Sequence, residues 1–329
     1  MKVLLAGADG ALGTPLTRLL LARGHTVLGL IRNPNGAPVL RARGVEPIVA
    51  DALDRDRLLR AVDRHSADAV IHELTALKKP PMRPSDMRMT NRLRTEGTAN
   101  LMAAAARLGA NRIVTQSIVL GYGFRDHGDH VLTEADPFCI PAGDLTDETL
   151  GALRAAEVQT FEAPQGIALR YGLLYGGDAS QIRPMLAKRR VPIAAGGSLG
   201  WIHHLDAAAA TVAALERGRP GQAYNIVDDQ PATWTEVFTA MAAAFGAPPP
   251  RRVPRWLLRL LAPYIGMVMV DTGLRVSNAK AKTELGWQPR FRNYREGIAA
   301  MVSGSDEDAE VLRLLSRGGL GDSNGRIAS

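Results

Sequence analysis

The sequence predicts an α/β protein with a doubly wound parallel sheet and a smaller C-terminal α/β substrate domain. The first half of the 329-residue chain alternates short runs rich in β-branched residues with longer amphipathic stretches. This alternation is typical of strands that pair in parallel through helical crossovers. A glycine-rich segment, LLAGADGALG, lies between the first expected strand and the first expected helix. In such sheets that junction is the usual place for a nucleotide-binding turn.

The expected strands define where one domain ends and the next begins. They lie at residues 2–7, 26–32, 46–51, 69–74, 112–117 and 166–172. They predict a dinucleotide-binding domain over residues 1–175, which also receives a returning segment near residues 200–218. Beyond residue 175 the pattern loosens into Gly- and Pro-rich turns, so residues 176–302 are expected to form mainly the substrate domain. Residues 303–329 are expected to form a tail that frays.

Composition limits the partners and the compartment. The net charge of +7 comes from scattered arginines and not from a clustered basic stripe, which argues against a nucleic-acid partner. The single cysteine, Cys139, excludes an internal disulfide and suits a reducing compartment. The apolar start ends in glycine too early for a signal peptide. We therefore expect a cytoplasmic monomer or homodimer that acts on a small molecule and has no metal site.

The longest apolar run, residues 256–270, is interrupted by Arg259 and Pro263. It is shorter than the ~20 residues that a membrane span needs, so no integral membrane segment is expected. One interpretation is a helix over a substrate pocket or the core. The alternative is contact with a membrane surface, which would be supported by the arginines just before the run: Arg251, Arg252 and Arg255.

The glycine spacing G-x-x-G-x-x-G indicates a phosphate-binding loop. Gly7 can make the tight turn, Gly10 can let the backbone approach a pyrophosphate, and Gly13 can let the helix pack closely on the strand. The helix that follows offers unpaired N–H groups and a partial positive charge to the phosphates.

Two residues at later strand ends bear on the choice of cofactor. Arg32 stands where an acidic residue would hold the adenosine ribose, and a guanidinium instead pairs with a phosphate. This favours NADP, with NAD as the alternative and a solvated arginine as the structural interpretation. Asp51 could accept a hydrogen bond from the adenine amino group, or it could cap the next helix.

Five motifs in order resemble the extended branch of the short-chain dehydrogenase/reductase superfamily, and within it the NAD-dependent epimerase/dehydratase family. The motifs are GADGALG, EGTANLMAAAARLGANRIVTQS, LRYGLLYGG, WIHHLDAAAATVAAL and SNAKAKTELGWQP, which together span roughly residues 1–300. The resemblance implies a Rossmann-like fold. It also implies a set of cofactor-binding residues: Gly7, Asp9, Gly10, Ala11, Leu12, Gly13, Arg32, Asp51, Ala52, Glu73, Leu74, Thr75, Tyr171, Gly172 and Leu173.

The resemblance also assigns the reacting groups. Ser117 falls where the family has its catalytic serine or threonine, although a serine that ends a buried strand can simply satisfy the backbone. The family's acid/base is a tyrosine followed four residues later by a lysine, which helps to lower the phenol pKa from about 10. Counting from the neighbouring motifs places these two positions at Thr149 and Leu153, on a helix expected over residues 147–162. No Tyr-x-x-x-Lys occurs anywhere in the chain, and Arg94 replaces a usual asparagine, with Asn91 one turn earlier.

Other side chains are candidates for the missing proton donor and for substrate contacts. Tyr122 is the first candidate donor. The weaker candidate donors are Tyr171, Tyr175, His127 and His130. Candidate substrate contacts are Tyr175, Trp201 and His203.

The sequence thus predicts an NAD(P)-binding enzyme, related to epimerases, dehydratases and reductases, with a non-standard active site and a small or medium organic substrate. Its reaction is either hydride transfer with a relocated proton donor or a non-redox elimination, epimerisation or cyclisation. The alternative is a catalytically degenerate NADP(H)-binding sensor.

Overall fold

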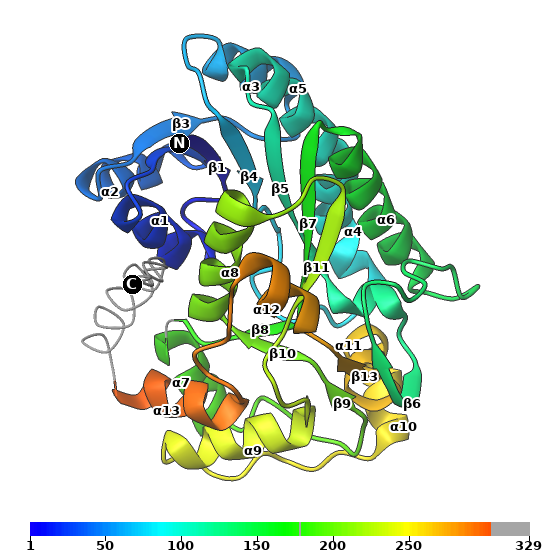
Figure 1. Ribbon diagram of the computed structural model, residues 1–329. Coiled ribbons are helices and arrows are strands. Elements are labelled where there is room, and N and C mark those ends of the chain that lie inside the picture. The colour runs from blue at the N-terminus through cyan, green and yellow to red at the C-terminus, as the bar shows by residue number, and fades with distance from the viewer. Residues whose placement is uncertain (178, 304–329) are drawn as a thin grey trace, which may run out of the picture.

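The computed structural model describes residues 1–177 and 179–303. At its centre lies a parallel sheet of seven strands with helices on both faces (Figure 1). In spatial order the strands are β11 (Gln222–Ile226), β7 (Gln165–Tyr171), β5 (Arg112–Ile118), β4 (Ala69–His72), β1 (Lys2–Ala6), β2 (Thr26–Ile31) and β3 (Glu46–Val49). The predicted fold class is confirmed.

The strands are short and apolar because helices cover the sheet on both sides, as parallel sheets require. All four residues of β4 are buried, and so are six of the seven residues of β7. The six strands expected from the sequence are present. The seventh, β11, was not expected and extends the sheet beside β7.

Two groups of helices make the outer layers. One face is covered by α1 (Gly13–Ala22), α2 (Ala37–Ala42), α8 (His204–Arg217) and α12 (Ala279–Leu285). The other face carries α3 (Arg55–Val62), α5 (Thr98–Leu108) and α6 (Asp147–Glu162). Helix α5 continues α4 (Arg88–Arg92) through a π-helical turn, Leu93–Gly97.

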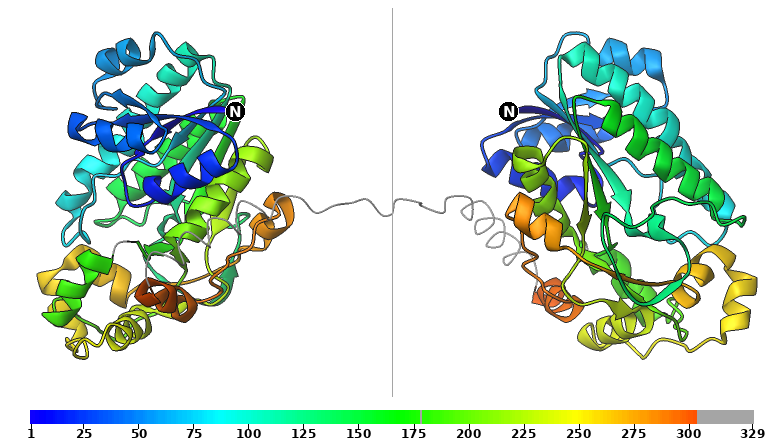
Figure 2. Two further views of the ribbon diagram at one scale, coloured as in Figure 1. Left: turned by 90° about the vertical axis from the view of Figure 1, so that its left-hand side faces the viewer. Right: turned by 45° about the vertical axis from the view of Figure 1, so that its right-hand side comes forward.

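The remaining elements pack below the carboxyl ends of the strands around a second apolar core (Figure 2). Its helices are α7 (Ala179–Ala187), α9 (Trp234–Ala244), α10 (Arg255–Leu261), α11 (Pro263–Val270) and α13 (Tyr294–Ser303). Its short strands form three pairs, namely β8 (Leu173–Tyr175) with β10 (Trp201–His203), β9 (Ser198–Leu199) with β12 (Ala232–Thr233), and β6 (Asp126–Leu132) with β13 (Gly273–Val276).

The chain crosses between these two parts more than once. Helix α8 returns to the sheet near the expected segment 200–218, and β11 and α12 follow it. Conversely, β6 belongs to the first 175 residues but pairs with β13 in the C-terminal part. Residues 304–329, which include nearly all of the expected tail, lie outside the described residues.

The apolar run at 256–270 divides into two different helices. Helix α11 is largely buried, as expected for a helix over the core. Helix α10 instead exposes Trp256 (65 %), Leu260 (70 %) and Leu261 (63 %). Among the described residues, no helix combines the length and the apolarity that crossing a membrane requires. Contact of α10 with a membrane surface stays a prediction.

The strand order positions the site. From β1 the chain winds outward through β2 to β3, and then returns to place β4 on the other side of β1. Loops on the two sides of this reversal diverge, which leaves a crevice at the carboxyl ends of β1 and β4.

Candidate active site

The turn between β1 and α1 is shaped by its glycines. Gly7 has a φ of +92°, and a Cβ there would lie 3.0 Å from the Glu73 carbonyl oxygen. A Cβ on Gly13 would overlap the Gly7 carbonyl, so only glycine allows α1 to start this close to β1. No side chain caps the start of α1, and its first turn has no acidic residue. The N–H groups at this end of α1 therefore face the crevice without a competing carboxylate.

A cavity of about 1000 Å³ begins at this turn and runs over the carboxyl ends of the central strands. All but one of the expected cofactor residues line it: Gly7, Asp9, Gly10, Ala11, Leu12, Gly13, Arg32, Asp51, Ala52, Glu73, Leu74, Thr75, Tyr171 and Gly172. The exception is Leu173, whose neighbour Leu174 lies in the wall instead. The size and the lining suit an extended molecule such as a dinucleotide.

The adenosine end of the cavity contains Arg32 and Asp51. Arg32 is exposed at the end of β2, and within the described part of the chain it forms no ion pair. The Asp51 carboxylate accepts a hydrogen bond from the Leu53 N–H at 2.9 Å. The alternative role of Asp51 as a helix cap is wrong, because Asp54 caps α3 by accepting from the Arg57 N–H at 3.1 Å.

Ser117 lies near the end of β5 and lines the cavity. Its hydroxyl is buried and has no hydrogen-bond partner among the described residues. The structural interpretation, in which the hydroxyl satisfies the backbone, is therefore not supported. A buried hydroxyl without a partner is costly, so a bound molecule is the natural partner.

Helix α6 spans Asp147–Glu162, the same residues that were expected from the sequence. Thr149 and Leu153 are buried in it (3 % and 0 % exposed), and neither belongs to the cavity lining. The Thr149 hydroxyl accepts from Asn91 Nδ2 and from the Tyr264 hydroxyl, each at 3.4 Å. The helix is thus packed as a structural element at the two positions where a tyrosine and a lysine would act.

Arg94 enters the cavity wall near these positions, from the π-helical turn Leu93–Gly97. Its guanidinium donates to Asn91 Oδ1 at 3.4 Å, and Asn91 also bonds Thr149. The sequence showed Arg94 as a departure from the family pattern but did not identify it as a site residue. The other lining residues that were missed include His204, Gln116 and the loop Lys78–Pro81. The loop follows a strand end, which was the available signal.

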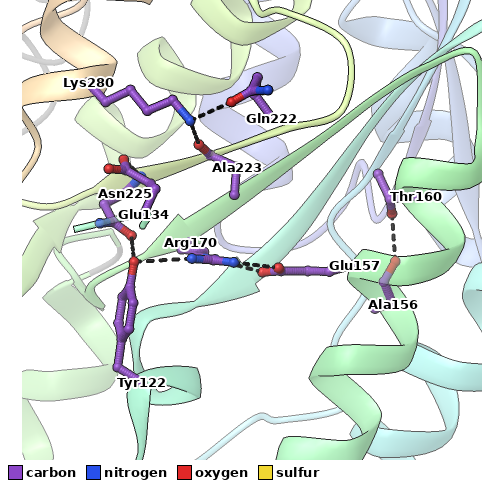
Figure 3. Close-up of polar contacts among 10 residues, drawn as sticks. All are labelled: Tyr122, Glu134, Ala156, Glu157, Thr160, Arg170, Gln222, Ala223, Asn225 and Lys280. Carbon is purple, nitrogen blue, oxygen red and sulfur yellow. Dashed lines mark hydrogen bonds and ion pairs between the residues drawn. The ribbon is translucent and has the colours of Figure 1, made fainter. Parts of the chain in front are cut away.

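Tyr122 is not part of the cavity lining. Its hydroxyl donates to Asn225 Oδ1 at 2.8 Å and accepts from Arg170 at 3.1 Å, while Arg170 forms a bidentate ion pair with Glu157 (Figure 3). Burial raises the pKa of Tyr122 to about 12, against the opposing effect of Arg170. This corrects the expectation that Tyr122 is the proton donor, because its hydroxyl is engaged in a buried network away from the cavity.

The expected substrate contacts Tyr175, Trp201 and His203 also lie outside the cavity lining. The Tyr175 hydroxyl donates to Asp228 Oδ2 at 3.2 Å, and Trp201 Nε1 donates to the Ala232 carbonyl at 2.8 Å. His203 caps α8 by accepting from the Leu205 N–H at 3.2 Å. This corrects the expectation for all three, since they pack in the second core.

The weaker candidate donors either lie outside the cavity lining or have a hydroxyl that is already hydrogen-bonded within the protein. His127 and His130 belong to strand β6 and do not line the cavity. Tyr171 does line it, but its hydroxyl donates to Glu73 Oε1 at 2.8 Å and also bonds Thr211 at 2.7 Å. Burial raises the pKa of Glu73 to about 8, although the hydrogen bond from Tyr171 acts in the opposite direction.

Comparison with known proteins places this geometry among nicotinamide-dependent enzymes. Residues 3–142 match the NAD dependent epimerase/dehydratase family. A Streptomyces sp protein named 3-diazoavenalumate denitrifying reductase is 36 % identical over 310 residues, which cover 91 % of this chain and 99 % of the relative. A protein of Stenotrophomonas maltophilia (strain K279a) named 2-alkyl-3-oxoalkanoate reductase is 30 % identical over 264 residues, which cover 75 % of this chain and 77 % of the relative.

Solved structures share the architecture. The human epimerase family protein SDR39U1 with NADPH matches with a TM-score of 0.73 at 21 % identity, covering 93 % of this chain and all (100 %) of that one. The Bordetella bronchiseptica enzyme WbmH in complex with NAD+ matches with a TM-score of 0.71 at 19 % identity, covering 92 % and 97 %. At these identities the two structures show the fold alone.

Proposed function

Because the chain belongs to the NAD-dependent epimerase/dehydratase family, we propose that it is an NAD(P)H-dependent reductase whose substrate accepts hydride without needing a proton in the same step. A carbon-bound diazonium ion that is reduced with loss of N2 meets this requirement. The observation that carries the proposal concerns α6: Thr149 and Leu153, the residues that the sequence assigns to the proton-donor and lysine positions, are buried outside the cavity wall.

The residues present fit the cofactor of this family. The glycine turn leaves room for a pyrophosphate, and the uncapped start of α1 favours its charge. The unpartnered Ser117 hydroxyl supplies a polar contact further along the cavity. Arg32 favours NADP(H), because its exposed guanidinium has no carboxylate partner in the described structure and can pair with a 2′-phosphate.

The proposed chemistry balances without an acid. When bound, NAD(P)H would supply a hydride whose electron pair forms the new C–H bond at the carbon that carries the diazonium group, and the C–N bonding pair would leave with N2. The positive charge of the diazonium cancels the negative charge of the hydride, so the protein has no proton to provide. Its residues bind, orient and shield the reacting molecules.

The reactions in the relatives' names differ in whether they need a proton donor. A ketone reductase must protonate an oxygen, and a proton donor accelerates that step by typically 10²–10⁴-fold. A reductase that replaces a diazonium group with hydride does not have this requirement. The 36 % identical relative, which matches nearly its whole length, is named for a reaction of the second kind. Its name and the non-standard α6 therefore support the same proposal.

The proposal is tested with the compound in the relative's name, 3-diazoavenalumate, and NADPH carrying deuterium at the transferable position. We expect enzyme-dependent NADPH oxidation, release of N2, and deuterium in the product at the carbon that lost nitrogen. Deuterium should not enter that position from D2O. A reaction without enzyme and one with the Gly13→Ala variant measure spontaneous reduction, which diazonium compounds undergo readily.

Two outcomes would overturn the proposal. Turnover of a 2-alkyl-3-oxoalkanoate without turnover of the diazo compound would identify a ketone reductase with another proton source. Tight NADPH binding without turnover of either compound would favour the sensor, which is the alternative supported by the lost catalytic pair.

A further inference from the structure

Arg94 is a cation in the cavity wall without a counterion. Its guanidinium is mostly withdrawn from solvent, and within the described residues its side-chain hydrogen bond is the 3.4 Å contact with the neutral Asn91 amide. No carboxylate of the described residues lies within ion-pair distance of it. The ionisable groups that face it are Tyr264, Cys139 and His72. Burial raises the pKa of Tyr264 and that of Cys139, the latter to about 12, and lowers the pKa of His72 to about 4, so all three are neutral at neutral pH.

Two nearby arginines have carboxylate partners. Arg170, which is buried, forms two hydrogen bonds with the Glu157 carboxylate, at 3.0 and 2.8 Å. Arg92, two residues before Arg94, forms an ion pair with Glu96 at 2.7 Å. Removing a guanidinium from water without such a partner costs free energy, and this desolvation lowers the pKa of Arg94. An anion bound in the cavity would offset the cost.

The local backbone holds Arg94 in this position. The π-helical turn inserts one extra residue between α4 and α5, which rotates the side chains that follow it relative to a regular helix. On the same turn of chain, Asn91 bonds both Arg94 and Thr149, and the Tyr264 hydroxyl donates to Thr149. Arg94 is therefore oriented by a polar cluster built from α4, α6 and α11.

Part of the wall of this cavity is apolar. Met89 and Leu93 precede Arg94 in the chain, and Leu77 and Ile118 line the same cavity, which also has Lys78 and Lys79 in its wall. A guanidinium matches a carboxylate in two-point geometry, whereas the apolar wall suits a hydrocarbon or aromatic body.

We propose that Arg94 binds the carboxylate of an apolar or aromatic acid substrate and so fixes the substrate in the cavity. The identity of the acid as a diazo compound rests on the proposed function; the carboxylate contact rests on Arg94. The name of the 36 % identical relative describes a substrate of this chemical class, a carboxylate anion. The negative carboxylate also offsets the positive charge that a diazonium group would bring beside Arg94.

The test uses binding and needs no turnover. Cinnamate and its amide, cinnamamide, have nearly the same shape and differ in charge. Each is titrated calorimetrically into protein saturated with NADP+, as wild type, Arg94→Gln and Arg94→Lys. The control variant is Arg92→Gln, since Arg92 is exposed, forms its own ion pair and does not line the cavity.

We expect wild type to bind cinnamate about 10- to 100-fold more tightly than cinnamamide, the range for a hydrogen bond between charged groups. Arg94→Gln should remove this preference without changing NADP+ affinity, Arg94→Lys should keep part of it, and Arg92→Gln should keep all of it. Equal affinity for the two probes in wild type, no cinnamate binding at millimolar concentration, or a preference that survives in Arg94→Gln would each overturn the assignment. If the preference is present but the diazo compound is not reduced, the proposed function fails and the carboxylate site stands.

Discussion

The two ends of the cavity are built in different ways. At the end formed by β1 and α1, backbone groups and small residues of one continuous segment, Gly7 to Gly13, make the binding surface. At the other end, Arg94 lines the cavity, and the side chains that orient it from behind come from segments far apart in the chain: Asn91 on α4, Thr149 on α6 and Tyr264 on α11. Backbone geometry determines which residues can form the first end. The second end depends on which side chains from distant segments come into contact.

This difference explains why the family's glycine motif is kept at one end, whereas its Tyr-x-x-x-Lys pair is missing at the other. A dinucleotide imposes the same shape on every protein that binds it, so the glycine turn cannot vary much. The substrate imposes no such common shape, and residues there can change together. The sequence assigns Thr149 and Leu153 to the positions of the proton donor and its lysine, and Arg94 to a position where the family usually has an asparagine. Changes at the two ends should therefore have separable effects.

The largest effect is expected from a methyl group in the glycine turn. In Gly13→Ala the added Cβ would overlap the Gly7 carbonyl, so α1 must move away from β1. We expect loss of detectable NADPH binding by calorimetry and a destabilisation on the order of 3 kcal/mol or more. The matched control is Gly151→Ala on α6, where an added Cβ meets no atom within 4 Å. That variant should bind NADPH normally; similar losses in both would show that the turn is not special.

Sequence reasoning predicted the first end well for the same reason. The turn, Arg32, Asp51 and the segment Glu73–Thr75 follow strands that can be recognised locally, and all of them line the cavity. Strand β11 was missed because it is separated from its partner β7 by a long stretch of chain. Tyr122 was chosen by its distance along the chain from Ser117, whereas a 3-10 turn directs its hydroxyl to Asn225 and Arg170. The position of Arg94 depends on a π-helical turn that no local sequence pattern predicts.

The next effect concerns the phosphate that distinguishes the two cofactors. Arg32→Ala should weaken NADPH binding by about 10- to 100-fold, the usual range for hydrogen bonds between charged groups, and leave NADH binding nearly unchanged. Calorimetric titration of both nucleotides measures this. Exposed Arg18 on the outside of α1 gives the control variant Arg18→Ala. Equal affinities of wild type for NADPH and NADH would remove the case for NADP.

Glu73 gives the cofactor end a pH dependence of stability. Its folded-state pKa of about 8 lies above the ordinary value of 4.5, so the proton is bound more tightly in the folded protein. The resulting stabilisation is complete below pH 4.5 and is lost as the pH rises to about 8. Glu73→Gln stays neutral, so it should become more stable than wild type above pH 8, by on the order of 1–3 kcal/mol.

Urea denaturation across this pH range tests the prediction, with Glu162→Gln at the exposed end of α6 as the control. Asp206 and Asp228 also titrate in the folded protein, but they are present in all three proteins and cancel in the difference. A constant difference between wild type and Glu73→Gln at every pH would show that Glu73 has the same pKa in the folded and the unfolded protein.

Ser117 lies between the two ends and separates the candidate reactions. Under the proposed function no negative charge develops on a substrate oxygen, so Ser117→Ala should lose only a positioning hydrogen bond. The expected fall in kcat is about tenfold at most, with unchanged NADPH affinity. Steady-state kinetics with the diazo compound measures it. A loss of about 10²–10³-fold, as seen when an oxyanion loses a donor, would point to a carbonyl substrate instead.

The smallest change in activity is expected from restoring the missing pair. The family resemblance assigns a tyrosine and a lysine to positions 149 and 153 of α6, but here Leu153 is fully buried and Thr149 is packed against Tyr264 and Asn91. A tyrosine at position 149 would overpack the core at a cost of about 1–3 kcal/mol, and a lysine at position 153 would bury a charge without a partner. Thr149→Tyr with Leu153→Lys should therefore fold less stably and reduce the diazo compound no faster than wild type. Thr149→Ser, which keeps the hydroxyl, controls for the change at that position.

A gain in ketone reduction by the double variant would mean that the ancestral geometry still operates. The substrate end would then be a decayed ketone reductase, and the contrast between the two ends of the cavity would lose its basis.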